Sequence, residues 1–149
     1  MSKKLIKKLI EDISALGALP FYLFLSLFFL VINQSKLFIW FISGLFFAYL
    51  GTILIRITYH KDRPIKAKYK NLIEKIDASS FPSLHSWRAT MIAFFLITIY
   101  NNPYLNTFII LFAFSIYFSR YYLKKHYILD IIFGIIFGLM ESLIIISFI

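Results

Sequence analysis

The stretch LFIWFISGLFFAYLGTILIRITY, residues 37–59, decides the fold, because its only charged residue, Arg56, stands close to its end. A bilayer core about 30 Å thick is crossed by ~20 helical residues, at a rise of about 1.5 Å each. The stretch shows no alternation of polar and apolar residues, and a bilayer admits only helices and closed barrels. It is therefore predicted to be a membrane-spanning helix.

Four further stretches have the same character, namely residues 13–32, 82–100, 104–123 and 127–149. Short polar turns separate most of these stretches. The sequence thus predicts an all-α fold, a single membrane-embedded domain over residues 1–149 with about five transmembrane helices. Residues 1–12 differ, because Leu5, Ile6, Leu9 and Ile10 recur at helical spacing with lysines between them. This pattern predicts an amphipathic helix lying in the membrane interface.

The composition fits a membrane protein. Hydrophobic residues make up 60% of the chain, against roughly 45–50% in soluble proteins. The net charge is +9, and the basic residues that produce it lie mostly between the apolar stretches. This distribution favours a bilayer with anionic lipids as partner and argues against nucleic acid. The chain has no cysteine and no cluster of carboxylates, so neither a metal site nor a cofactor is predicted.

Polar residues gather where the predicted helices end. They form three clusters: Arg56 with Arg63-Pro64, then Pro82-Ser83-Leu84-His85, and finally Ser119-Arg120 with His126 and Asp130. Helices that cross a membrane in alternating directions place all three clusters on the face where the chain begins. The clusters are therefore predicted to meet, and polar groups at such depth are usually functional.

The residue types in these clusters suit phosphoryl transfer. Arginine presents a planar fork of donors that matches phosphate oxygens, and Ser83 is expected in the first turn of a helix, where free N–H groups favour an anion. His126 and Asp130 stand four residues apart, so Asp130 is expected to accept the Nδ1 proton and leave Nε2 free to attack. His85 is available as the proton donor to a leaving oxygen.

The ordered pattern Arg56-x6-Arg63-Pro64, Pro82-Ser83-x-His85 and Ser119-Arg120-x5-His126-x3-Asp130 resembles the type 2 phosphatidic acid phosphatase (PAP2) superfamily. The resemblance implies a metal-independent lipid phosphatase in which His126 becomes phosphohistidine, Asp130 orients it and His85 protonates the leaving group. It also implies a set of residues that hold the phosphoryl oxygens: Arg56, Arg63, Ser83, the backbone of Leu84, and Arg120.

The chain departs from the family at two positions, since the family usually has Lys in place of Arg56 and Gly in place of Leu84. An exchange of Arg56 for Lys is accordingly expected to be mild. The form Phe-Pro-Ser-Leu-His-Ser also resembles relatives that transfer phospho-head groups onto lipids. Two enzymes remain open, a hydrolase of lipid phosphate or diphosphate monoesters and a lipid head-group phosphotransferase. A non-enzymatic channel or scaffold would place polar residues at several depths, whereas here only Glu141 lies apart.

Two charged residues lie inside predicted helices. Arg88 follows His85 by one turn, where it either contacts a lipid head group or extends to the interface. Glu141 is expected to make a polar contact between helices near the opposite membrane face. Gly134 and Gly138 have the spacing that allows close helix packing.

The lysines predict the orientation of the protein in the cell membrane. Eleven of them flank the membrane face that carries the clusters, and only Lys36 flanks the other. Positively charged loops stay in the cytoplasm. The site is therefore expected to face the cytoplasm.

Overall fold

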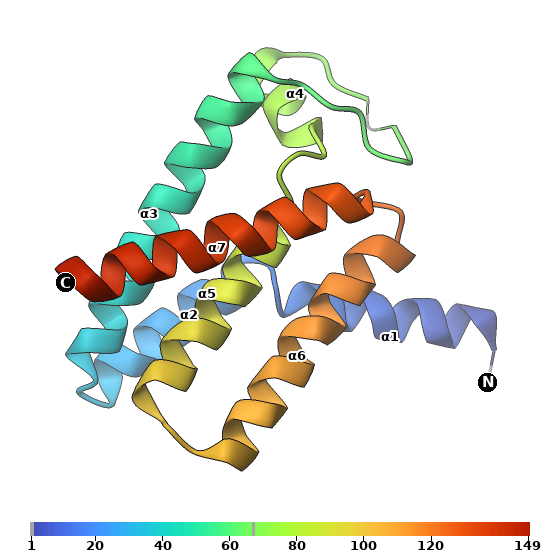
Figure 1. Cartoon of the computed structure of the whole chain (residues 1–149). Coiled ribbons are helices and arrows are strands. Elements are labelled where there is room, and N and C mark those ends of the chain that lie inside the picture. The colour runs from blue at the N-terminus through green and yellow to red at the C-terminus, as the bar shows by residue number, and fades with distance from the viewer. Residues whose placement is uncertain (1, 67) are drawn as a thin grey trace.

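The structure, a computed structural model, describes residues 2–66 and 68–149 (Figure 1). Within these ranges the chain forms helices and no strand, which confirms the all-α prediction. The helices are α1 (Lys3–Ala15), α2 (Leu19–Val31), α3 (Ser35–Thr58), α4 (Leu72–Ala78), α5 (Leu84–Ile99), α6 (Pro103–Tyr122) and α7 (Ile128–Phe148).

Fewer helices of the described chain qualify as membrane spans by length and composition than the five that the sequence predicted. By length and composition, α3 and α7 are the helices of the described chain that can each cross a membrane alone. A third crossing is possible if α1 and α2, which meet at a bend of 46°, form one broken span. Helix α5 is apolar but has only 16 residues. The predicted count of five spans is thus not confirmed, although the protein has the helices of a membrane protein.

The predicted helix over residues 13–32 is wrong, because the chain breaks it between Ala15 and Leu19. Gly17 lies in this break and packs so closely that a Cβ there would come within 2.7 Å of Ile116 Cγ2. Pro20 follows in the first turn of α2, where its missing N–H costs no hydrogen bond. The amphipathic helix predicted over residues 1–12 therefore continues to Ala15; Met1 lies outside the described residues.

The long loop after α3 contains a helix that the sequence analysis missed. Asn71 caps α4, and its Oδ1 accepts a hydrogen bond from the Glu74 N–H at 2.8 Å. The spacing of Asn71 and Glu74 is typical of a helix start and could have revealed the helix. The next helix begins two residues later than predicted, because Ser83 is the N-cap of α5 and Pro82 precedes it.

Helix α5 forms the centre of the bundle and packs against α3, α6 and α7 (Figure 1). Its contact with α7 is especially close at two glycines. A Cβ on Gly134 would lie 2.5 Å from the Ser83 carbonyl oxygen, and one on Gly138 would lie 2.7 Å from that of Trp87. The predicted close packing of these glycines is confirmed, and it fixes the first turn of α5 against α7.

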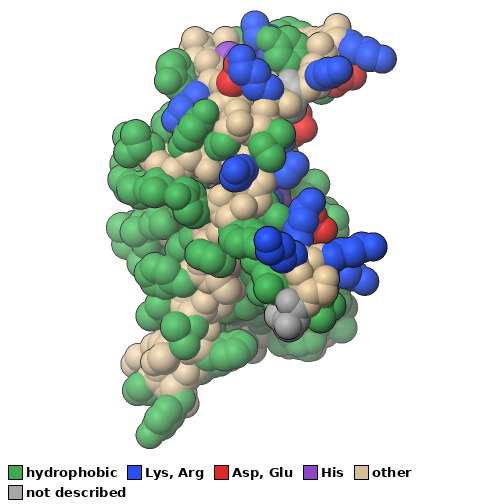
Figure 2. Space-filling model, turned by 90° about the vertical axis from the view of Figure 1, so that its right-hand side faces the viewer, with side chains coloured by type: hydrophobic (Ala, Val, Ile, Leu, Met, Phe, Trp, Pro, Cys, Tyr) green, Lys and Arg blue, Asp and Glu red, His purple; other side chains and the backbone are tan. Residues whose placement is uncertain are grey.

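The surface divides into apolar and basic regions. On the face shown in Figure 2, Lys and Arg side chains gather in the upper and right-hand parts, and hydrophobic side chains cover the left and the bottom. The outer faces of the long helices expose large apolar residues, such as Phe46 and Phe108. So much exposed apolar surface matches a lipid environment.

Candidate active site

The three sequence clusters meet at one cavity of about 380 Å³. Its charged side chains and histidines come from α3, the following loop, α4, α5, α6 and the turn before α7: Arg56, Arg63, Asp77, His85, Arg88, Arg120 and His126. Leu84, another predicted site residue, also lines the cavity. The predicted convergence of the clusters is confirmed, because α3 and α6 end at the same end of the bundle where α5 and α7 begin.

His126 lies in the turn between α6 and α7 and is 2% exposed. Its Nδ1–H donates to the carbonyl oxygen of Ser80 at 2.7 Å, which leaves the Nε2 lone pair facing Arg120, whose Nη2 lies 3.4 Å away. Burial, and then the nearby Arg120 charge, lower the pKa of His126 well below its ordinary value. The imidazole is therefore neutral at neutral pH, as a nitrogen nucleophile must be.

Asp130 does not orient the His126 ring, contrary to the sequence prediction. Its Oδ1 accepts from Lys61 Nζ at 2.6 Å and its Oδ2 from the Tyr127 N–H at 2.9 Å, while the Ser83 N–H donates to its backbone carbonyl at 3.0 Å. The expected spacing fails because α7 begins after Tyr127, so His126 lies outside the helix. Asp130 instead joins the starts of α5 and α7.

The residue that takes over this role, Ser80, was missed. Two hydrogen bonds fix it against the loop after α3: its N–H donates to the Lys61 carbonyl at 2.7 Å, and its Oγ donates to the Asp62 carbonyl at 3.2 Å. Its carbonyl is thereby aimed at His126. A backbone carbonyl carries no side-chain signature, so no sequence pattern could have identified it.

Arg120 stands in the last turn of α6 and is 8% exposed. Its Nη1 donates to Ser14 Oγ at 2.6 Å, and its Nη2 faces His126. Within the described chain its Nε has no hydrogen-bond partner. The guanidinium thus keeps donors beside the candidate nucleophile, where phosphoryl oxygens would lie.

Arg56 lines the cavity, yet its donors are largely occupied. Nε, Nη1 and Nη2 donate to the carbonyls of Phe81, Ile76 and Pro82 at 3.2, 3.1 and 3.0 Å. Only its remaining N–H groups are available for the predicted phosphate contact. Arg56 therefore holds the segment that leads into α5.

Arg63 and Arg88 complete the basic lining. Arg63 Nη2 donates to the Asp77 carbonyl at 2.5 Å. Arg88 is 3% exposed, and it donates from Nε to the Gly17 carbonyl and from Nη1 to Tyr49 Oη, each at 3.0 Å. Of the two interpretations of Arg88, extension to the interface is wrong, because its side chain is buried at the cavity wall.

Ser83 is fully buried and is not among the residues that line the cavity. Its Oγ lies 2.8 Å from Ser86 Oγ, so the hydroxyl predicted for phosphate serves the start of α5. Glu141 makes the expected contact between helices, since Trp87 Nε1 donates to its Oε2 at 2.6 Å. The contact joins α5 to the second half of α7.

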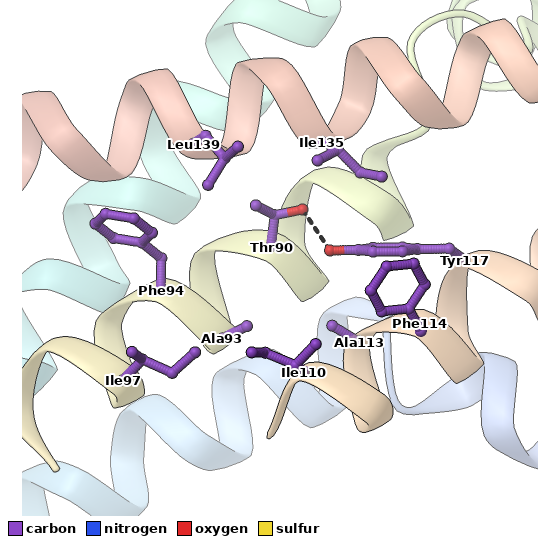
Figure 3. Close-up of a pocket in the computed structure, with 10 residues that line it drawn as sticks. All are labelled: Thr90, Ala93, Phe94, Ile97, Ile110, Ala113, Phe114, Tyr117, Ile135 and Leu139. Carbon is purple, nitrogen blue, oxygen red and sulfur yellow. Dashed lines mark hydrogen bonds between the residues drawn. The ribbon is translucent and has the colours of Figure 1, made fainter. Parts of the chain in front are cut away.

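A second cavity, of about 220 Å³, lies between α5, α6 and α7 (Figure 3). Apolar side chains line it, and its polar groups are Thr90 and Tyr117, whose hydroxyls are 2.8 Å apart. Thr90 follows Arg88 by two residues, so the two side chains leave α5 on opposite sides. This cavity is therefore separate from the basic one and has no charged lining residue.

Residues 37–149 match the family model described as the PAP2 superfamily. The chain belongs to the PAP2 superfamily. Its fold is similar to the crystal structure of Aquifex aeolicus LpxE, with a TM-score of 0.80 and 22% identity over 99% of this chain and 88% of that one. It is also similar to a PAP2-type phosphatidylglycerolphosphate phosphatase from Bacillus subtilis, with a TM-score of 0.70, 23% identity, and 99% and 78% coverage. No curated protein gives a significant match.

Proposed function

We propose that this PAP2 protein is a metal-independent membrane phosphatase that hydrolyses a lipid phosphate or diphosphate monoester. The observation that carries the proposal is His126 Nε2, an unprotonated nitrogen at a cavity lined by arginines. Such a nitrogen can attack phosphorus, and the arginines can balance the charge of the phosphoryl oxygens.

In the first step His126 Nε2 forms a bond to phosphorus while the bond to the lipid oxygen breaks, and that oxygen takes a proton from the His85 imidazolium. Burial, and then the Arg120 charge, lower the pKa of His85 in the empty cavity. His85 therefore takes up its proton together with the anionic substrate, whose charge offsets the arginines. In the second step water attacks the phosphohistidine, His85 accepts the proton of the water, and the P–N bond breaks to release phosphate. Donors fixed before the reaction, such as Arg120 Nη2, stabilise the charge that develops on the equatorial oxygens. The Ser80 carbonyl keeps the ring orientation and stabilises the imidazole while it carries the phosphoryl group.

Three observations support a lipid as the substrate. The basic cavity stands at one end of a bundle whose outer faces are apolar, so a head group can reach it from the membrane surface. The chain belongs to the PAP2 superfamily. One structure of similar fold is a phosphatidylglycerolphosphate phosphatase, which acts on a phosphorylated lipid.

Phosphate release from a panel of lipid phosphates tests the proposal. His126→Ala should abolish release, whereas His60→Ala, at a histidine outside the cavity, should retain it. Labelled substrate should leave acid-labile, base-stable phosphate on the wild-type protein and none on His126→Ala. Release by His126→Ala at the wild-type rate would refute the nucleophile. Label that passes to a lipid alcohol instead of water would identify the phosphotransferase.

We also propose that the site faces the cytoplasm. The hydrogen bond from Arg120 to Ser14 joins α1 to the site end of α6, so the N-terminal lysines lie at the same end as those of the loops. The lysine count of eleven against one therefore supports the inside orientation. A cysteine placed at Leu72, an exposed residue of α4, tests it, because the chain has no other cysteine. An impermeant thiol reagent should label Leu72→Cys only after the cells are permeabilised; labelling of intact cells would reverse the orientation.

A further inference from the structure

The bend between α1 and α2, residues 14–19, is here named the N-terminal elbow. It lies outside residues 37–149, the region that matches the family model. Two of its residues, Ala18 and Leu19, nevertheless line the basic cavity, and two others bind arginines of that cavity. The elbow is therefore part of the cavity wall, although none of the three sequence motifs includes it.

The contact between Ser14 and Arg120 is short and buried. Arg120 Nη1 donates to Ser14 Oγ at 2.6 Å, and the two residues are 8% and 5% exposed. The other terminal nitrogen, Nη2, lies 3.4 Å from His126 Nε2. A guanidinium is planar, so fixing Nη1 also fixes the direction of Nη2. Ser14 thus determines how Arg120 faces the nitrogen that we assign as nucleophile.

The elbow makes a parallel contact to the second buried arginine. The carbonyl of Gly17 accepts from Arg88 Nε at 3.0 Å. Gly17 also lies against His85, since a Cβ added to Gly17 would be 3.4 Å from both His85 Cβ and Cδ2. One turn of chain therefore contacts two arginines and one histidine of the cavity.

A packing role alone does not explain the serine. The face of α1 that is buried against the rest of the protein carries two residues, Ile10 and Ser14. An apolar residue at position 14 would bury more apolar surface and leave no hydroxyl to satisfy. The serine hydroxyl does serve as an acceptor for a buried guanidinium, whose N–H would otherwise lose a hydrogen bond.

We propose that Ser14 is a positioning residue of the phosphate site, holding Arg120 so that its free donors face the phosphoryl group at His126. The inference rests on the proposed function for its chemistry. It extends the site to the N-terminal segment. Ser14 touches no substrate; it acts through Arg120.

Substitutions of Ser14 test the role, with a buried serine elsewhere as control. Ser14→Ala removes the acceptor, Ser14→Thr keeps it, and Ser26→Ala removes a buried hydroxyl of α2 that has no partner in the described residues. Two quantities are measured: kcat/KM for a lipid phosphate, and the affinity for orthovanadate, a mimic of pentacoordinate phosphorus, by thermal shift. The second readout needs no turnover, so it separates failure of the inference from failure of the proposed function.

We expect Ser14→Ala to lower kcat/KM and orthovanadate affinity about tenfold or more, the effect of losing one hydrogen bond to a charged group. Ser14→Thr should stay within about threefold of wild type, and Ser26→Ala should be unchanged, on the same constants. In an Arg120→Lys background, Ser14→Ala should cost little more, because the interaction is already lost. Wild-type constants for Ser14→Ala would overturn the proposal. So would a fold-loss from Ser14→Ala that is the same in the Arg120→Lys background as in the wild type. If Ser14→Ala does not fold, Ser14→Thr decides. Near-wild-type constants for Ser14→Thr would support the proposal. Losses in Ser14→Thr as large as those expected for Ser14→Ala, while the wild type still binds orthovanadate, would overturn it.

Discussion

Replacement of Arg56 by Lys separates what the family pattern suggests from what the structure requires. The family pattern that the sequence resembles has Lys at this position, so the resemblance predicts a mild effect. In the structure, however, the guanidinium reaches three carbonyl oxygens, of Phe81, Ile76 and Pro82, with three different nitrogens. A lysine has one nitrogen and cannot span these acceptors. We therefore expect Arg56→Lys to destabilise the segment before α5.

The magnitude follows from the bonds that are lost. If Lys keeps one of the three, two hydrogen bonds from a charged donor disappear, at about 1.5–3 kcal/mol each. Two of the three hydrogen bonds are only partly buried, so water can bind the carbonyl oxygens that lose their donor. The net loss in the free energy of unfolding is therefore about 3 kcal/mol. For a chain of this size that lowers the melting temperature by roughly 6–12 °C.

Thermal unfolding in detergent micelles measures this effect. The matched control is Arg63→Lys, the same exchange at an arginine with one backbone hydrogen bond, which should lower the melting temperature by about 3 °C or less. A melting temperature of Arg56→Lys within about 2 °C of wild type would show that the three contacts contribute little to the stability of the protein.

Three further predictions follow from single contacts. Because burial and the Arg120 charge lower the pKa of His126, its ring should stay neutral well below the ordinary pKa of about 6.5; an NMR titration of labelled histidine that gave an ordinary or raised pKa would contradict this. Lys61→Met should destabilise the protein by about 3 kcal/mol, since it leaves the fully buried Asp130 carboxylate without its cation; adding Asp130→Asn should recover part of the loss, and no recovery in chemical unfolding would refute the pairing. Gly138→Ala should lower the melting temperature by several degrees, because its Cβ would press on the Trp87 carbonyl and Thr90 Cβ; an unchanged melting temperature would mean that α5 and α7 pack less closely.

The sequence predicted most of the helices and the end of the bundle at which the three clusters meet. Both depend on local composition and on the order of the segments along the chain. Long apolar runs specify helices in a bilayer, as residues 37–59 show, and alternation of direction brings Arg56, His85 and His126 to one end. The observed cavity contains all three. Gly17 and Pro20 are residues that favour a helix break, so the sequence does contain a signal for the break between α1 and α2. The apolar residues on both sides led to the prediction of one continuous helix.

The partners of the site residues did not follow, because they depend on where chain segments distant in sequence come to lie. Spacing suggested Asp130 for His126, and the fold gave that role to the Ser80 carbonyl, 46 positions earlier. The family resemblance suggested Arg56 for phosphate, and in the fold Arg56 donates to three backbone carbonyls. The sequence by itself determined which residues carry charge, which stretches are long and apolar, and at which end the clusters meet. Only the tertiary structure decided which donor faces which acceptor, since a hydrogen bond requires its two atoms to approach within about 3 Å.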